Sequence, residues 1–227
     1  MIQLIIYDLD GTLIDSRQDI ANAVNWTLQE LGLGELPGER IRSFVGNGVQ
    51  NLMQRALKDV VVRKQREENK AHSLPSLSRS IKLFRQRYGE HLLDHTRLYP
   101  SVRKVLEFFK DRKQAVITNK PEEFSIKILQ GLGVDSYFFR VLGGDRGLPK
   151  KPAPEPVLEI LRQAGVPTEE AILVGDSATD VETGRNAGVK TLAVTYGFGS
   201  QREIENSGPL MILTDLAELI QCPLLVN

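Results

Sequence analysis

The sequence predicts an α/β protein: a Rossmann-like parallel sheet with helices on both faces, plus an inserted small all-α domain. Two observations carry this prediction. Short apolar runs alternate with helical patterns over most of the 227 residues. The segment from about residue 15 to residue 95 breaks the alternation, because it has helical periodicity and no convincing strand. We therefore expect a core domain of residues 1–14 and 96–227, with residues 15–95 as the insertion.

The strands of the core are expected where short apolar runs end in polar or glycine residues. They are Gln3–Tyr7, Gln114–Thr118, Arg140–Gly143, Ala171–Gly175 and Thr191–Thr195, with a weaker candidate at Leu210–Leu213. The helices are expected at Ser101–Arg112, Pro121–Leu132, Pro154–Ala164, Ser177–Ala187 and Asp215–Gln221. Pro121 and Pro154 suit a first helical residue, and Gly133, Gly165 and Gly188 follow the expected helix ends.

The insertion is expected to be helical because three apolar stripes in it have helical spacing. They begin at Ile20, Val49 and Ile81. Between the second and third stripes lies the polar stretch Arg63–Lys70, which carries charges of both signs. Mixed charge favours a solvated helix or loop over a nucleic-acid site.

The composition excludes several classes of protein. The 29 basic and 29 acidic side chains cancel, so no overall field attracts nucleic acid or an anionic membrane. The first apolar run, Leu4–Tyr7, is ended by Asp8 and is far too short to span a membrane. A single cysteine, Cys222, forms no internal disulfide, which is typical of a reducing compartment. We expect a cytoplasmic enzyme, monomeric or homodimeric, with no nucleic-acid or membrane partner.

Polar residues that can act on a phosphate group follow strand after strand of the predicted sheet. In chain order they are Asp8 and Asp10, Thr118 and Asn119, Lys151, and Asp176 and Asp180. The loops at the carboxyl ends of parallel strands share one edge of the sheet, and ligands bind there. We therefore expect these residues to meet, although some are more than a hundred positions apart.

The pattern Asp8-Leu9-Asp10-Gly11-Thr12 is the most specific of these signals. Two carboxylates at positions i and i+2 leave a strand on one side, while Leu9 points to the core. Gly11 lets the backbone turn and lets its amides approach an anion closely. A single acidic turn is ordinary in a loop, but the whole pattern directly after an apolar strand arises by chance on the order of once in a thousand chains.

The predicted meeting of carboxylates requires a cation. Two carboxylates ~4 Å apart repel by about 4 kcal/mol at an effective dielectric constant of 20. Asp176 and Asp180 add to this repulsion, and Lys151 offsets only one of the four negative charges. A hard divalent cation that prefers oxygen ligands, with Mg²⁺ as the obvious choice, makes such a cluster tolerable. The absence of Cys and His from these motifs argues against Zn²⁺.

Four segments together resemble the motifs of the haloacid-dehalogenase superfamily of phosphatases, in the same order. They are Asp8-Leu9-Asp10-Gly11-Thr12-Leu13, Thr118-Asn119-Lys120, Lys151-Pro152 and Gly175-Asp176-Ser177-x-x-Asp180. The helical insertion is similar to the small cap domain of that family. Further segments resemble its phosphoglycolate phosphatase-like branch, and they are Val45-Gly46-Asn47-Gly48, Leu98-Tyr99-Pro100, Gly143-Gly144-Asp145 and Lys151-Pro152-Ala153-Pro154.

The resemblance implies Mg²⁺-dependent hydrolysis of a small phosphate monoester, first of all 2-phosphoglycolate, through an aspartyl-phosphate. It implies that Asp8 is the nucleophile and that Asp10 is the general acid and then the general base. Asp8, the backbone carbonyl of Asp10 and Asp176 would hold the metal. Asp180, four residues further on, would bind the metal or orient its waters.

The remaining motif residues are expected to bind the phosphate group. By the same resemblance, Thr118 donates its hydroxyl to a phosphoryl oxygen, and Lys151 neutralises the developing charge. The proline after Lys151 favours it over its neighbour Lys150. Asn119 has two compatible roles, contact with the phosphate and capping of the helix expected at Pro121.

Two alternatives stay open at this point. Relatives that share such a core and cap act on other sugar or acid phosphates, on pyrophosphate, or as phosphosugar mutases. A non-catalytic phospho-aspartate signalling module belongs to a different class, and it needs neither Asp10 nor a cap. One departure from the branch is Ser101, where a glycine usually follows Tyr-Pro.

Overall fold

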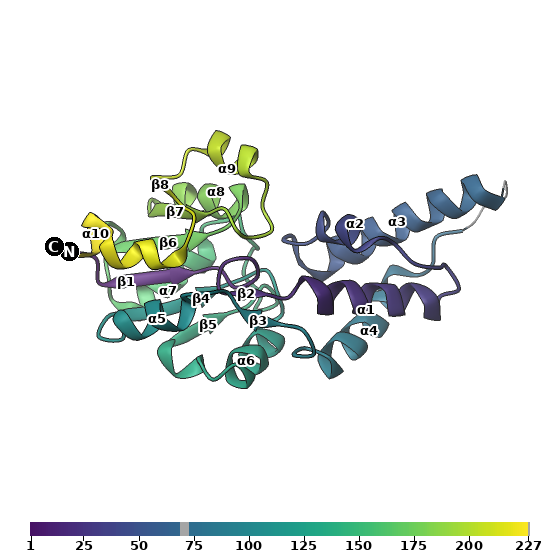
Figure 1. Cartoon of the computed structure of the whole chain (residues 1–227), viewed down its shortest axis with the longest axis horizontal. Coiled ribbons are helices and arrows are strands. Elements are labelled where there is room, and N and C mark those ends of the chain that lie inside the picture. The colour runs from purple at the N-terminus through teal and green to yellow at the C-terminus, as the bar shows by residue number, and fades with distance from the viewer. Residues whose placement is uncertain (69–72, 227) are drawn as a thin grey trace. The chain divides into compact units, whose positions relative to one another are not determined.

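The computed structural model describes residues 1–68 and 73–226. The chain divides into two compact units (Figure 1). The core unit comprises Met1–Asp15 and Arg97–Asn227, and the helical unit comprises Ser16–Thr96. Each boundary falls one residue after the boundary expected from the sequence.

Six parallel strands form the sheet of the core unit. They are β1 (Leu4–Tyr7), β4 (Lys113–Ile117), β5 (Arg140–Leu142), β6 (Ala171–Gly175), β7 (Lys190–Val194) and β8 (Met211–Leu213). Their order across the sheet is β5-β4-β1-β6-β7-β8. Every predicted strand is present, with each end within one residue of its expected position. The Rossmann-like α/β fold predicted from the sequence is confirmed.

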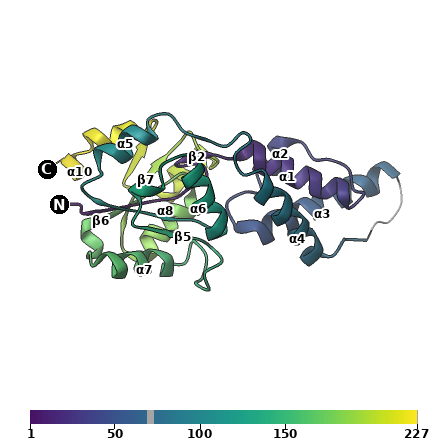
Figure 2. The ribbon, with the colours of Figure 1, turned by 90° about the horizontal axis from the view of Figure 1, so that it is seen from below.

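Helices cover both faces of this sheet (Figure 2). They are α5 (Val102–Phe108), α6 (Glu122–Gly131), α7 (Glu155–Ala164), α8 (Ala178–Ala187), α9 (Gln201–Ser207) and α10 (Pro223–Val226), with short 3₁₀ turns at Asp135–Tyr137, Thr168–Glu170 and Leu216–Gln221. On one face, Val157 and Ile160 of α7 join Leu4 and Ile6 of β1 in a buried cluster. On the other face, the Gln114 side chain donates to the backbone of α5. Strands covered on both faces are continuously apolar, as the sequence of β1 is.

Several helix ends differ from the predictions. Pro121 and Pro154 are the N-cap residues of α6 and α7, so each helix begins one residue later than expected. Helix α5 ends at Phe108, four residues before the predicted end, because the chain must turn before β4 begins at Lys113. The helix expected at Asp215–Gln221 is a 3₁₀ helix, and α9 and α10 were not predicted. The glycines predicted to follow helices do so with left-handed backbone at Gly133, Gly165 and Gly188.

A second, two-stranded sheet lies where the chain leaves and re-enters the core unit. Its strands are β2 (Ile14–Asp15) and β3 (Arg97–Leu98), which pair antiparallel. Two residues are too few to show any periodicity, so neither strand could be predicted from the sequence.

The helical unit contains α1 (Arg17–Glu30), α2 (Gly38–Arg42), α3 (Gly48–Glu68) and α4 (Leu77–Glu90), and no strand among its described residues. Its core is built from the predicted apolar stripes, and the rings of Phe84 and Tyr88 stack at 5.4 Å. Of the polar stretch Arg63–Lys70, residues 63–68 continue α3 as a helix, and residues 69–70 lie outside the described residues.

A buried carboxylate joins the two ends of the helical unit. Asp19, in the first turn of α1, is 1% exposed. It accepts hydrogen bonds from the backbone N–H groups of His95 (3.0 Å) and Thr96 (2.8 Å), and from the Thr96 hydroxyl (2.7 Å). A buried carboxylate is tolerated where hydrogen bonds replace its hydration, so this arrangement fixes the start of the unit to its end.

No helix in the described parts of the chain has both the length and the apolar character needed to cross a membrane.

Ser101 is strained, and its replacement by glycine should stabilise the protein. Its φ angle is 69°, in the left-handed region that disfavours side chains by roughly 1–2 kcal/mol. Glycine removes that strain but costs roughly 0.5–1 kcal/mol of chain entropy. We expect Ser101→Gly to raise the free energy of unfolding by about 0.5 kcal/mol in urea denaturation. Ser101→Ala keeps the strained Cβ and should give no gain. A Ser101→Gly variant less stable than the parent would show that the Ser101–Asp215 hydrogen bond (3.3 Å) outweighs the strain.

Candidate active site

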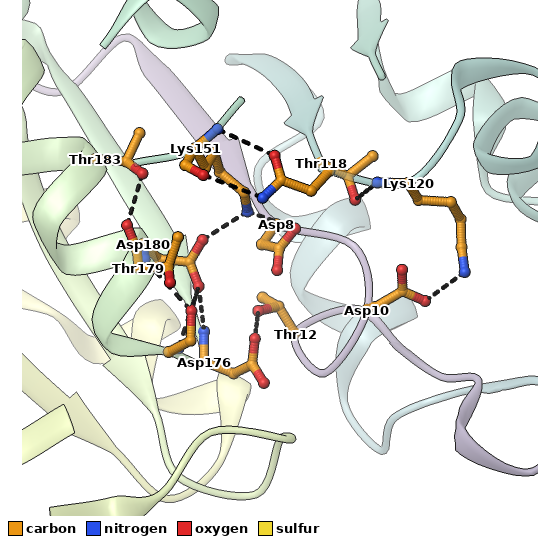
Figure 3. A network of polar contacts seen from close by, with 12 residues as sticks. Asp8, Asp10, Thr12, Thr118, Lys120, Lys151, Asp176, Thr179, Asp180 and Thr183 are labelled. Carbon is orange, nitrogen blue, oxygen red and sulfur yellow. Dashed lines mark hydrogen bonds and ion pairs between the residues drawn. The ribbon is translucent and has the colours of Figure 1, made fainter. Parts of the chain in front are cut away.

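Three buried carboxylates from two strand ends meet at the carboxyl edge of the sheet (Figure 3). Asp8 follows β1, Asp176 follows the neighbouring strand β6, and Asp180 lies in the first turn of α8. Each offers one oxygen, and the three oxygens lie within 4.8 Å of one another. None of these residues is more than 8% exposed. The predicted convergence of carboxylates distant in sequence is therefore present, and β1 and β6 produce it by pairing side by side.

Lys151 lies between two of these carboxylates. Its Nζ is 2.8 Å from Oδ1 of Asp8 and 2.6 Å from Oδ1 of Asp180. Burial alone would lower the pKa of Lys151, but Asp180 and Asp8 together raise it above the ordinary value, so the ammonium stays charged. Lys150 is exposed, and the structure places Lys151 in the site, as the sequence favoured.

Asn119 holds the backbone of Lys151 in place. Its Oδ1 accepts from the Lys151 N–H (3.0 Å), and its Nδ2 donates to the Lys151 carbonyl (3.2 Å). The expectation that Asn119 caps the following helix is wrong, because the N-cap of α6 is Pro121. The long loop that carries Lys151 is thus tied to the end of β4. Whether Asn119 also binds the phosphate stays a prediction.

Both carboxylate oxygens of Asp180 have partners, with Lys151 at Oδ1 and three donors at Oδ2. Its Oδ2 accepts from the Ser177 hydroxyl (2.6 Å) and from the backbone N–H groups of Ser177 (3.1 Å) and Asp176 (3.2 Å). These contacts form a capping box at the start of α8. A Cβ at Gly175 would overlap the Asp180 side chain, so this strand end requires glycine.

An aspartate just before a helix is often an exposed N-cap residue, but Asp176 is neither exposed nor the N-cap of α8. Ser177 is the N-cap of α8, and Asp176 is 2% exposed. Its Oδ2 accepts from the backbone N–H groups of Phe198 (2.6 Å) and Gly199 (3.3 Å), and Thr12 donates its hydroxyl to Oδ1 (3.4 Å). Burial and the neighbouring Asp180 raise the pKa of Asp176 to about 7, against these hydrogen bonds. Burial likewise raises the pKa of Asp8 well above its ordinary value, partly offset by Lys151.

Asp10 stands apart from the three-carboxylate group. Its Oδ1 forms an ion pair with Nζ of Lys120 at 2.8 Å, and the Lys120 side chain is 5% exposed. Lys120 was part of a recognised motif but had no expected role, because its partner lies more than a hundred residues away. With this second lysine counted, the four carboxylates and two lysines leave two excess formal negative charges, one fewer than the sequence count.

Thr118 and Gly11 occupy the expected loops with contacts that the sequence did not indicate. The buried Thr118 hydroxyl oxygen accepts from the Lys120 N–H (3.2 Å). The Gly11 amide donates to the Ile14 carbonyl (2.9 Å), and a Cβ at Gly11 would overlap the Asp176 carboxylate. Glycine is therefore needed here for the approach of Asp176. The phosphate contacts expected of Thr118 and Gly11 stay predictions.

The donor set fits a hard divalent cation. Oxygens that share a cation at about 2.1 Å lie roughly 3–4 Å from one another, and the three aspartate oxygens are grouped on nearly this scale. The group contains only carboxylates and carries excess negative charge, which disfavours softer metals that prefer thiolate or imidazole. Asp8, Asp176 and Asp180 would thus hold the ion.

Comparison with known proteins identifies the family of this chain. Residues 5–194 match the family model described as haloacid dehalogenase-like hydrolase. A phosphoglycolate phosphatase of Aquifex aeolicus is 41% identical over 86% of this chain and 86% of its own length, and one of Chromobacterium violaceum is 38% identical over 96% and 95%. A crystal structure of a predicted phosphoglycolate phosphatase from Haemophilus somnus 129PT superposes with a TM-score of 0.89, at 32% identity and 97% coverage of both chains. The chain belongs to the haloacid dehalogenase-like hydrolases.

The raised pKa values make the stability of the metal-free protein depend on pH. The folded state keeps a proton on Asp176 up to about pH 7, whereas the unfolded chain releases it near pH 3.8. Stability from this group is therefore complete below about pH 4 and is lost as the pH rises through about 7. We expect the free energy of unfolding in EDTA to fall between pH 5 and pH 8, and to fall less in Asp176→Asn, in urea denaturation at each pH. An equal fall in Asp176→Asn would assign the dependence to other groups.

Proposed function

We propose that this protein is a Mg²⁺-dependent phosphatase that hydrolyses a small phosphate monoester, 2-phosphoglycolate before others. The carrying observation is the buried group of Asp8, Asp176 and Asp180 with Lys151 between two of its members. The names of the similar proteins from Aquifex aeolicus and Chromobacterium violaceum support the choice of substrate.

The reaction proceeds in two displacements. Asp8 attacks phosphorus, so that a carboxylate-to-phosphorus bond forms as the bond to the leaving alkoxide breaks. Asp10 donates a proton to that alkoxide, and then removes a proton from the water that cleaves the aspartyl-phosphate. Bound Mg²⁺ supplies positive charge for the phosphoryl oxygens. The proton transfers are assigned to Asp10 because its carboxylate leaves the same strand end as Asp8 and lies outside the group of Asp8, Asp176 and Asp180.

Positive charge from the chain itself completes the site. Lys151 already contacts the Asp8 oxygen Oδ1, so its ammonium lies beside the carboxylate that would receive the phosphoryl group. Asn119 fixes the backbone of Lys151 and keeps it there. The Thr118 hydroxyl and the Gly11 turn would contact the remaining phosphoryl oxygens, and Asp180 would bind the metal or orient its waters.

The roles of the helical unit, the cellular location and the oligomeric state are proposed from the sequence alone. The helical unit would be the cap that selects the substrate, the location would be cytoplasmic, and the protein would act as a monomer or homodimer. Hydrolysis of other sugar phosphates or pyrophosphate, and phosphosugar mutase activity, are the alternatives that an assay must distinguish.

A panel of phosphate esters tests the proposed activity and its substrate. We expect inorganic phosphate release that requires Mg²⁺ and is abolished by EDTA, with 2-phosphoglycolate giving the highest kcat/KM. If another ester gave the highest kcat/KM, the assignment of 2-phosphoglycolate as the substrate would be wrong, but the assignment as a phosphatase would stand. Transfer of phosphate between sugar positions without release would indicate a mutase, and activity unchanged by EDTA would refute the metal.

Asp10→Asn tests the division between proton transfer and metal binding. Asparagine keeps the shape and the backbone carbonyl but cannot exchange a proton, so we expect kcat to fall by about 10²–10⁴-fold. Mg²⁺ affinity, measured by calorimetry, should stay within about threefold of the parent, a change of no more than about 0.7 kcal/mol. Unimpaired turnover would contradict the role of Asp10 in proton transfer.

A further inference from the structure

The loop Tyr196–Gly199, which follows β7, reaches the acidic site through its backbone. The N–H groups of Phe198 and Gly199 both donate to Oδ2 of Asp176, at 2.6 and 3.3 Å. They lie 22 and 23 residues beyond Asp176 in the sequence, and β7 pairs directly with the β6 strand that precedes Asp176. Two amides on one oxygen fix the orientation of that carboxylate, and the other oxygen, which Thr12 contacts, lies on the side of Asp8 (Figure 3).

Two glycines make this close approach possible. A Cβ at Gly197 would overlap the Asp176 side chain and the carbonyl oxygen of Gly11, and a Cβ at Gly199 would overlap the Asp176 carbonyl oxygen. Neither glycine has the positive φ angle that would by itself explain its identity. The space that a side chain would need is taken by Asp176, so the loop and the carboxylate are packed against each other.

Tyr196 connects the same loop to the turn that carries Asp8. Its hydroxyl donates to the Thr12 carbonyl at 2.8 Å. Its ring packs on Tyr99 at 4.5 Å, and the Tyr99 N–H donates to the Leu13 carbonyl (3.1 Å). The Thr12 hydroxyl in turn donates to Asp176. The loop therefore contacts both segments that supply the carboxylates, Asp8–Leu13 from one side and Asp176 from the other.

We propose that Tyr196–Gly199 is a positioning element of the metal site, which sets the orientation of Asp176 through two backbone amides and the position of the Asp8–Leu13 turn through the Tyr196 hydroxyl. This inference rests on the proposed function, because it assigns the loop to a cation held by Asp8, Asp176 and Asp180. Contacts behind metal ligands typically change metal affinity by 10–100-fold when they are lost. Changes in this loop should therefore alter Mg²⁺ affinity more than they alter kcat at saturating Mg²⁺.

Alanine at the two glycines tests the packing. We expect Gly197→Ala and Gly199→Ala in the full chain to weaken Mg²⁺ binding at least about tenfold in isothermal titration calorimetry. The Mg²⁺ concentration for half-maximal phosphate release should rise in parallel. Gly38→Ala is the matched control, because its Cβ meets nothing within 4 Å. Gly184→Ala controls for lost stability, because the atoms nearest its Cβ belong to Thr191 and the Val189 carbonyl and not to a carboxylate.

Tyr196→Phe tests the same inference without adding any atom. It removes one hydrogen bond to Thr12 and leaves the ring on Tyr99, so folding is preserved and Mg²⁺ affinity should fall about threefold or more. This variant decides the question even where an alanine variant does not fold. Parental Mg²⁺ affinity in Tyr196→Phe, or an equal loss of affinity in Gly184→Ala, would overturn the inference.

The parent protein separates the two proposals. If it binds Mg²⁺ and releases phosphate while the loop variants bind Mg²⁺ as tightly as the parent, the inference about the loop fails and the proposed function stands. If the parent neither binds Mg²⁺ nor releases phosphate, both fail.

Discussion

The repulsion among three buried carboxylates is the constraint on which the rest of the site depends. Asp8, Asp176 and Asp180 come within a few ångströms of one another where water cannot screen them. Burial first, and then the neighbouring carboxylates, raise the pKa values of Asp8 and Asp176. Lys151 removes part of that cost by contacting two of the three. A site with this residual charge is ready for a divalent cation, and binding of the ion relieves the same repulsion that the folded chain has to bear without it.

The sheet order explains how the fold sustains this repulsion. β1 lies between β4 and β6, so the loops that carry Asp8, Thr118 and Asp176 leave the sheet side by side. Two of the three carboxylates are then held by backbone N–H groups: those at the start of α8 donate to Asp180, and those of the loop after β7 donate to Asp176. Two of these carboxylates lie directly against glycines: a Cβ at Gly11 would overlap Asp176, and a Cβ at Gly175 would overlap Asp180. These hydrogen bonds, with the two ion pairs of Lys151, oppose the separation that the like charges favour.

The strands of the sheet and the aspartates of the site could be predicted because short, local sequence patterns indicate both. Six apolar runs marked six strands, and Asp8-Leu9-Asp10-Gly11-Thr12 marked the first loop. What the sequence could not reveal depends on tertiary contact. The pairing of Lys120 with Asp10 joins residues over a hundred positions apart, and the amides of Phe198 and Gly199 act on Asp176 through atoms that every residue has. A helix end such as that of α5 is likewise set by the start of the next strand.

The two buried lysines pair with different carboxylates of the first loop. Asp8 and Asp10 are two residues apart and leave the same strand on the same side, so local geometry alone would place both near the cation. Lys120, from the end of the adjacent strand β4, forms an ion pair with Asp10, whereas Lys151 contacts Asp8 and Asp180. Asp10 therefore has its own cationic partner and lies outside the group formed by Asp8, Asp176 and Asp180. The strand order thus brings a different lysine to each of two carboxylates that are only two residues apart. In the proposed reaction this difference separates the nucleophile, Asp8, from the proton-transfer residue, Asp10.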